Sequence, residues 1–224
     1  GRPVLESPGE ARADWQVICE IAGRVGLPMS YASPAEVFDE FTSLTNNYKG
    51  LTHDNLGSTG KLWPCANPES EDGTQILFGD GFPTASGRGR FVPCLYQPAD
   101  ELPDEEYPFV LTTGRVLEHW HTGTMTRRSY ALNSIAPDAF AAMNPDDLSR
   151  LGFPSDEMIA VSSRRGTIQL RVRSDDSIEP GCVFIPFHYR EAAANVLTTD
   201  ALDPYGKIPE FKFCAVRVDV PARV

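Results

Sequence analysis

The chain has 224 residues, enough for one well-formed hydrophobic core with an appendage, whereas two full domains would be cramped. Its 41% hydrophobic and 23% charged residues are typical of a globular protein and exclude disorder throughout. The net charge of −11 argues against nucleic acid as a partner, because duplex binding requires many Lys and Arg contacts to phosphate. No run of the sequence approaches the roughly 20 apolar residues of a membrane span, so we expect no membrane-spanning helix. We expect the protein to be cytoplasmic.

The N-terminal part predicts two amphipathic helices. The first begins at Asp14 as N-cap and ends at Gly26. The second follows Ser33, with Pro34 in the first turn and Glu36 at the capping-box position. It is expected to bury Val37, Phe38, Phe41 and Leu44.

Residues 46–104 lose this periodicity, and glycines, prolines and short apolar clusters follow one another. Loops of this length are uncommon in compact domains unless they are functional or pack against something else. We therefore expect this region to lie across a partner or another domain. The acidic cluster 100–106 lacks the spacing of an EF-hand and is typical of a solvated linker.

After Glu106 the chain predicts a barrel. The strand candidates are residues 109–113, 158–163, 167–173, 182–186 and 213–220. The clearest pair, residues 158–163 and 167–173, is expected to form a hairpin with one solvent-exposed face, and Arg164-Arg165-Gly166 to form its turn. A short helix begins after Asn144 and ends at Gly152. Since no βαβ rhythm repeats, the pattern favours a closed mixed barrel over a doubly wound sheet.

The stretch 112–128 combines glycines, hydroxyls, two histidines and three arginines behind the first strand candidate. Gly114 is expected to let the chain turn, and Arg115 offers a planar fork of donors suited to phosphate. Between residues 115 and 128 the single acid is Glu118. A basic loop in an acidic protein predicts a discrete anionic ligand.

Several alternatives stay open for this loop. His119 and His121 have the spacing of a metal clip, but zinc requires a third and a fourth ligand, which no other stretch supplies. A purely structural loop is a second alternative. We favour a third, in which the two imidazoles, with Thr122 and Thr124, donate hydrogen bonds to a phosphate-bearing heteroaromatic cofactor or stack on it. The five scattered cysteines are typical of reduced, mostly buried thiols.

Four stretches in this order and at this spacing resemble the C-terminal molybdopterin-dinucleotide-binding domain of the dimethyl sulfoxide reductase superfamily. They are residues 113–128, 143–147, 162–166 and 211–217. Earlier stretches, residues 9–21, 62–65 and 87–92, are similar to the corresponding region of formate dehydrogenase catalytic subunits. Nitrate reductases share the His-Trp-His loop and are the alternative.

The resemblance implies a mixed α/β fold in which residues 106–224 form a double-psi-like β barrel with short helices. Residues 1–105 would be an α-helical and irregular, extended segment of the catalytic subunit's central region. The barrel would cap a bis(molybdopterin guanine dinucleotide) carrying molybdenum or tungsten, in an enzyme that oxidises formate to carbon dioxide. The chain would be the C-terminal part, inactive alone. Its partners would be electron-transfer subunits and an N-terminal part bearing the iron–sulfur cluster.

The resemblance also implies which residues contact the cofactor, and it places no catalytic residue and no metal ligand on this chain. A non-catalytic scaffold module that binds the cofactor is a further alternative. The expected cofactor contacts are Thr113, Gly114, Arg115, Val116, Leu117, Glu118, His119, Trp120, His121, Thr122, Phe187, His188, Asn195 and Lys212.

Overall fold

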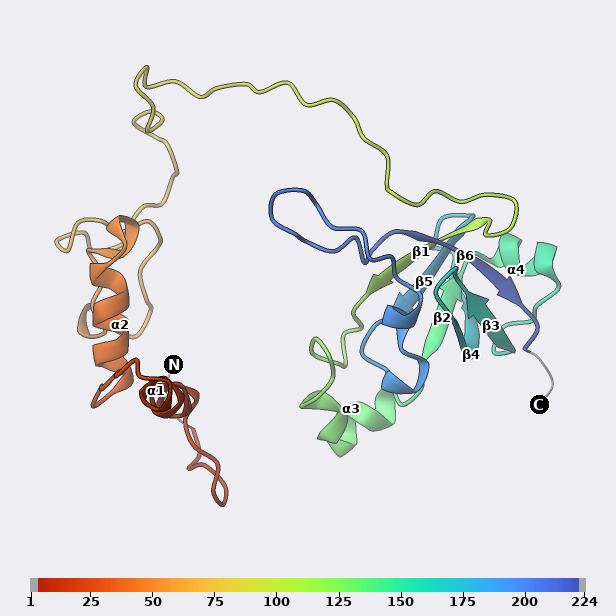
Figure 1. The fold of residues 1–224 in the computed structure, drawn as a ribbon, viewed down its shortest axis with the longest axis horizontal. Coiled ribbons are helices and arrows are strands. Elements are labelled where there is room, and N and C mark those ends of the chain that lie inside the picture. The colour runs from red at the N-terminus through yellow and green to blue at the C-terminus, as the bar shows by residue number, and fades with distance from the viewer. Residues whose placement is uncertain (1–3, 222–224) are drawn as a thin grey trace. The chain divides into compact units, whose positions relative to one another are not determined.

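The computed structural model describes residues 4–221, and the chain divides into two compact units, residues 1–93 and 94–224 (Figure 1). The division falls twelve residues before the boundary expected at 105/106, and the assignment of these parts as domains stays a prediction. No helix within residues 4–221 combines the length and the apolar character that crossing a membrane requires.

The first unit contains helices α1 (Asp14–Arg24) and α2 (Pro34–Ser43) and two short 3₁₀ turns. Ser33 caps α2 as expected, since its hydroxyl accepts a hydrogen bond from the Glu36 amide at 3.4 Å. The N-cap prediction for α1 was wrong by one residue: Ala13 occupies that position and no side chain caps the helix. Gly26, at φ +84°, follows the helix as a terminator should.

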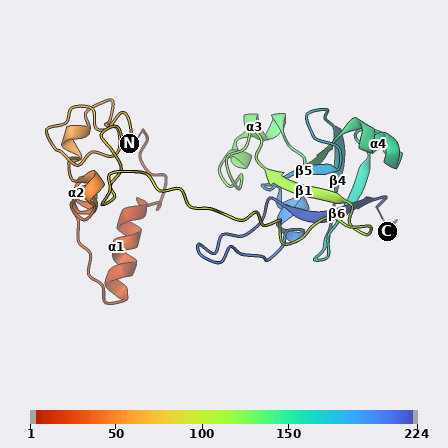
Figure 2. The same ribbon diagram turned by 90° about the horizontal axis from the view of Figure 1, so that it is seen from above.

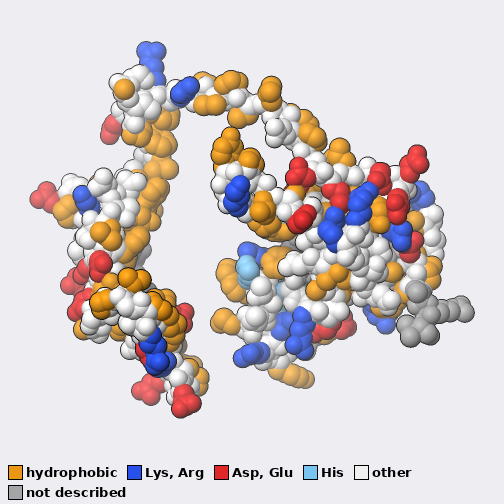
Figure 3. Space-filling view, viewed as in Figure 1, with side chains coloured by type: hydrophobic (Ala, Val, Ile, Leu, Met, Phe, Trp, Pro, Cys, Tyr) orange, Lys and Arg blue, Asp and Glu red, His pale blue; other side chains and the backbone are white. Residues whose placement is uncertain are grey.

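The apolar faces of both helices lie largely open within this unit. Helix α1 has no buried residue, and Ile18 and Ile21 are 58% and 56% exposed. On α2 the predicted burial was wrong, since Phe41 and Leu44 are exposed and Thr42 is the buried residue. Figure 3 shows hydrophobic side chains on the surface of this unit. The amphipathic pattern is present in both helices, but their apolar faces stay largely uncovered within residues 4–93.

The second unit is a closed six-stranded barrel, which confirms the predicted mixed barrel fold (Figures 1 and 2). The strands close in the order β1-β5-β2-β4-β3-β6, with β1 parallel to β5 and β2 parallel to β4. Short helices α3 and α4 lie at opposite ends of the barrel. The bounds are β1 Phe109–Gly114, α3 Tyr130–Ile135, β2 Phe140–Met143, α4 Pro145–Leu151, β3 Met158–Ser162, β4 Thr167–Ser174, β5 Cys182–Pro186 and β6 Cys214–Asp219.

The predicted hairpin and the predicted short helix are confirmed. Strands β3 and β4 pair antiparallel, and the Ser163 amide donates to the Gly166 carbonyl at 2.9 Å across the turn. Residues of β4 alternate between buried and exposed, as the period-2 pattern requires. Helix α4 is capped by the Asn144 side chain and ends at Gly152 in the left-handed conformation.

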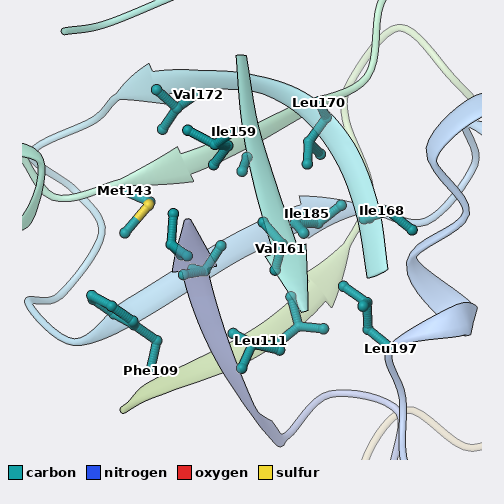
Figure 4. Packing of buried hydrophobic residues seen from close by; sticks show 14 of the residues in the cluster. Phe109, Leu111, Met143, Ile159, Val161, Ile168, Leu170, Val172, Ile185 and Leu197 are labelled. Carbon is teal, nitrogen blue, oxygen red and sulfur yellow. The ribbon is translucent and has the colours of Figure 1, made fainter. Parts of the chain in front are cut away.

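The barrel interior is the hydrophobic core (Figure 4). Leu111 of β1, Ile159 and Val161 of β3, Val172 of β4 and Ile185 of β5 are fully buried there. Opposed strands supply these side chains, so each pleat contributes alternate residues to one interior. The core makes the barrel a rigid support for the loops at its ends.

The acidic cluster 100–106 is not the solvated linker that the sequence predicts. The Glu101 carboxylate accepts from both terminal nitrogens of Arg165, at 2.5 and 2.8 Å, and from the Ala215 amide of β6 at 2.7 Å. Asp104 pairs with Arg164 at the same hairpin turn. Two acids thus fasten this segment to the barrel.

Candidate functional site

A pocket of about 840 Å³ lies at one end of the barrel, and seven of the expected cofactor-contacting residues line it. Because β1 and β5 are parallel neighbours, their carboxyl ends reach the same edge. Because β6 is antiparallel to β1, the segment that enters β6 reaches that edge too. The lining comprises Gly114, Arg115, His121, Thr122, Phe187, Asn195, Thr198, Thr199, Pro209, Phe211 and Lys212.

The charge of this pocket is positive. Arg115 and Lys212 line it, and no Asp or Glu does. Neither cation forms an ion pair within the described residues, whereas Arg165 and Arg127 are paired with glutamates elsewhere on the barrel. A guanidinium and an ammonium without carboxylate partners are suited to hold a phosphate.

Aromatic rings and amide or hydroxyl groups complete the lining. The His121 and Phe187 rings lie edge to face with centroids 5.6 Å apart. His121 adopts φ +48°, a conformation uncommon for a non-glycine residue and one that places this ring at the pocket. Asn195 and the neighbouring Thr198 add donors and acceptors. The set suits a planar heterocycle with an anionic tail.

Thr113 and Gly114 shape the pocket from the end of β1. The buried Thr113 hydroxyl donates to the Phe211 carbonyl at 2.7 Å and so fixes the segment before Lys212. The expected turn at Gly114 was wrong: this residue ends β1 and pairs with Pro186. Glycine is needed there because a Cβ would lie 2.5 Å from the Phe184 ring.

The middle of the predicted loop lies outside the pocket lining. Leu117 and Trp120 are exposed, and Val116 and Glu118 are half-buried. The Arg115 guanidinium lies 5.7 Å from the centroid of the Trp120 ring, a cation–π contact. The loop therefore presents Arg115 and His121 to the pocket, while the residues between them face elsewhere.

His119 lies behind the pocket with both ring nitrogens engaged. Its Nε2 lies 2.8 Å from the Ala136 carbonyl, which can only accept, so Nε2 carries the proton. The Thr126 hydroxyl lies 3.2 Å from Nδ1, within hydrogen-bond distance. That hydroxyl also accepts from the Trp120 amide. His119 thus fixes the path of the loop from inside the fold.

His188 is buried beside His119, with ring centroids 4.6 Å apart. It is 5% exposed, and neither ring nitrogen has a hydrogen-bond partner in the structure. Burial, together with smaller contributions from the nearby His119 and Arg127, lowers the pKa of His188 to about 4. At neutral pH the ring is therefore uncharged.

Four lining residues were missed by sequence reasoning: Thr198, Thr199, Pro209 and Phe211. The two threonines follow Asn195 closely, and Phe211 precedes Lys212, but no local pattern distinguishes them from ordinary loop residues. Their place depends on how the chain returns to β6. Residues 4–221 contain no group of three or more His, Cys, Asp or Glu side chains suited to hold a metal ion. Cys19, Cys65, Cys182 and Cys214 form no disulfide within this range.

The chain has relatives among known proteins. It is 43% identical over 220 residues to the F420-dependent formate dehydrogenase subunit alpha of Methanocaldococcus jannaschii, a match that covers 97% of this chain and 32% of the relative. The assimilatory nitrate reductase catalytic subunit of Bacillus subtilis is 35% identical over 222 residues, covering 94% and 31%. The chain spans about a third of the length of these relatives.

Structure and domain comparison agree with this relationship. Acetylene hydratase from Pelobacter acetylenicus has the same fold, with a TM-score of 0.69 at 21% identity over 98% of this chain and 34% of that one. Residues 109–215 match the molydopterin dinucleotide binding domain, a range that begins with β1 and includes the pocket-lining residues. Residues 109–215 of this chain are therefore a molydopterin dinucleotide binding domain, and the chain is homologous to part of formate dehydrogenase alpha subunits.

Proposed function

We propose that the chain binds part of a bis(molybdopterin guanine dinucleotide), with molybdenum or tungsten, in a formate dehydrogenase that oxidises formate to carbon dioxide. The observation that carries the proposal is the convergence of Arg115, Asn195 and Lys212 on one pocket that no acid lines. When bound, the cofactor would supply the two-electron chemistry, while the protein supplies binding, orientation and electrostatics.

The pocket-lining residues differ in the part of the cofactor that each would contact. Arg115 and Lys212 would hold the phosphate charge, and Asn195 would bind polar edges of the dinucleotide. The His121 and Phe187 rings would pack on a heterocycle. Of the other expected contacts, those within 116–120 and His188 lie outside this lining, so a role for them at the cofactor stays a proposal.

Formate as the substrate is supported by the higher identity to a formate dehydrogenase subunit than to a nitrate reductase, 43% against 35%. Because the chain spans about a third of these relatives, the activity also requires residues beyond it. We propose that those residues supply the protein ligand of the metal and the iron–sulfur cluster. Electron-transfer subunits would accept the electrons, and the enzyme would work in the cytoplasm.

Removing either pocket cation should lower the cofactor content of the complete enzyme. Arg115→Gln and Lys212→Gln each keep much of the side chain's bulk and remove its charge. We expect each to reduce occupancy by about threefold to tenfold, because a charge-assisted hydrogen bond to phosphate is lost. Metal analysis and guanine release measure the occupancy.

The controls are Arg171→Gln and Lys207→Gln, which remove the same charges outside the pocket lining. Both should retain full cofactor content. Unchanged content in Arg115→Gln and Lys212→Gln would contradict the cofactor assignment.

Turnover tests the reaction itself. The complete enzyme should reduce a redox dye with formate, and the 224-residue chain alone should not. Reduction of nitrate without formate oxidation would favour the nitrate reductase alternative. Cofactor binding with neither activity would favour a scaffold module.

A further inference from the structure

A second pocket, of about 480 Å³, lies beside the first and shares Thr122 with it. Residues from four short segments form it: 122–124, the 3₁₀ turn Thr126–Arg128, α3, and 188–191, which includes the start of the 3₁₀ turn Arg190–Ala192. Its lining comprises Thr122, Gly123, Thr124, Arg127, Arg128, Asn133, His188, Arg190 and Glu191.

This second pocket is strongly basic, although the protein is acidic. Three arginines line it against a single glutamate. Figure 3 shows Lys and Arg side chains gathered at the end of the barrel where α3 lies. Clustered guanidiniums repel one another, so an arrangement of this kind is stabilised by an anion.

The arginines differ in how they are held. Arg127 Nη1 donates to both Glu191 oxygens at 2.9 and 2.7 Å, and its guanidinium lies 5.1 Å from the Tyr189 ring centroid. That pair fixes one wall of the pocket. Arg128 and Arg190 form no ion pair within the described residues, and their exposed guanidiniums are available to a ligand.

His188 provides an independent indication that this pocket takes a ligand. It lines the pocket while 5% exposed, and both ring nitrogens lack a partner. Leaving a buried polar group without a hydrogen bond destabilises the fold, so native proteins rarely keep such a group without a function. Because the ring is neutral, one nitrogen can donate to a ligand oxygen.

We propose that this second pocket is a binding site for a small oxyanion, a phosphate or carboxylate group, held by Arg128, Arg190 and His188. It is distinct from the proposed dinucleotide pocket, with which it shares Thr122, and the proposal does not depend on formate being the substrate. The Thr122 and Thr124 hydroxyls supply further donors to such a group.

The test is calorimetric titration of the complete, cofactor-loaded protein with inorganic phosphate and, in a second arm, with acetate. We expect saturable binding of at least one of them, and the stronger ligand identifies the class. Arg128→Gln and Arg190→Gln remove exposed, unpaired cations and should leave the fold intact. Each should weaken binding by about threefold to tenfold, the value of one charge-assisted contact.

Two control variants locate the site. Arg171→Gln, on the outside of β4, and Lys207→Gln, outside both pocket linings, should leave the anion affinity unchanged. No binding of either anion, or equal loss in all four variants, would overturn the proposal. Binding that appears only after the cofactor is removed would assign the anion to the dinucleotide pocket and would also overturn it.

Discussion

At the scale of single residues, Glu101 makes more tertiary hydrogen bonds than its place in an acidic run suggests. Its side chain is 14% exposed and accepts hydrogen bonds from Arg165 and from the Ala215 amide. These bonds, led by that from Arg165, hold the pKa of Glu101 below its usual range. Glu101 therefore joins the segment before β1 to the β3–β4 turn and to β6.

Glu101→Gln should lower the free energy of unfolding by about 1–3 kcal/mol, because charge-assisted bonds to a largely buried carboxylate are lost. Urea denaturation at pH 7 measures the change. Glu105→Gln, an exposed neighbour, is the matched control and should change stability by less than about 0.5 kcal/mol. Equal stability of the two variants would contradict this role.

The same carboxylate predicts a pH dependence. Since its pKa is lowered by folding, its contribution is complete above the ordinary Glu pKa of about 4.3 and is lost as pH falls through the folded value. The stability difference between wild type and Glu101→Gln should be constant from pH 7 to 5. It should shrink below about pH 4. A stability difference at pH 2.5 that is as large as the difference at pH 7 would exclude this linkage.

Residue types indicated the basic character of the first pocket, but not the direction of each side chain. Arg115 was recognised as an anion ligand from its chemistry and Lys212 through the family resemblance, and both line the pocket. His119 and His121 have the same chemistry two positions apart, yet one is buried in the fold and the other lines the pocket. In an extended segment, side chains two positions apart point to the same side, but the positive φ of His121 changes this direction. No pattern in the sequence predicts that φ.

At the scale of elements, β1 and β5 approach closely at Gly114. A Cβ at this position would lie 2.5 Å from Phe184 Cε2 and 3.0 Å from Cζ. Gly114→Ala should therefore destabilise the barrel by about 1–3 kcal/mol, the usual cost of overpacking. Phe184→Leu removes the ring, and in that background the cost of Gly114→Ala should fall by at least half. Denaturation midpoints of the four proteins form the required cycle. The same cost in both backgrounds would show that the clash is not with Phe184.

The elements that sequence reasoning missed are β2 and α3. Strand β2 is the run Phe-Ala-Ala-Met, buried at every position, so it shows no alternation, and alanine has low strand propensity. Helix α3 has six residues and no side-chain cap. By contrast, β4 and α4 were predicted because alternation and caps are local signals.

At the scale of the molecule, the two units differ in how they are stabilised. The barrel holds the hydrophobic core, whereas the buried side chains described before residue 94 are Thr42, Leu51 and Cys65. Stability follows the apolar area removed from water. The barrel unit should therefore fold by itself, and the first unit should depend on other surfaces.

Residues 94–224 expressed alone should unfold in one cooperative transition in urea, followed by circular dichroism. Residues 1–93 alone should show a gradual, non-cooperative change. A barrel unit without a cooperative transition would mean that it depends on the preceding residues.

The sequence by itself determined the barrel class, the hairpin, the caps of α2 and α4, and the basic chemistry of the first pocket. These depend on neighbouring residues and on side-chain type, which can be read directly. Only the tertiary structure decided that β2 completes the barrel, that the Glu101 carboxylate accepts a hydrogen bond from β6, and that His188 is buried without a hydrogen-bond partner. Those outcomes depend on contacts between residues distant in sequence, for which no local pattern carries a signal.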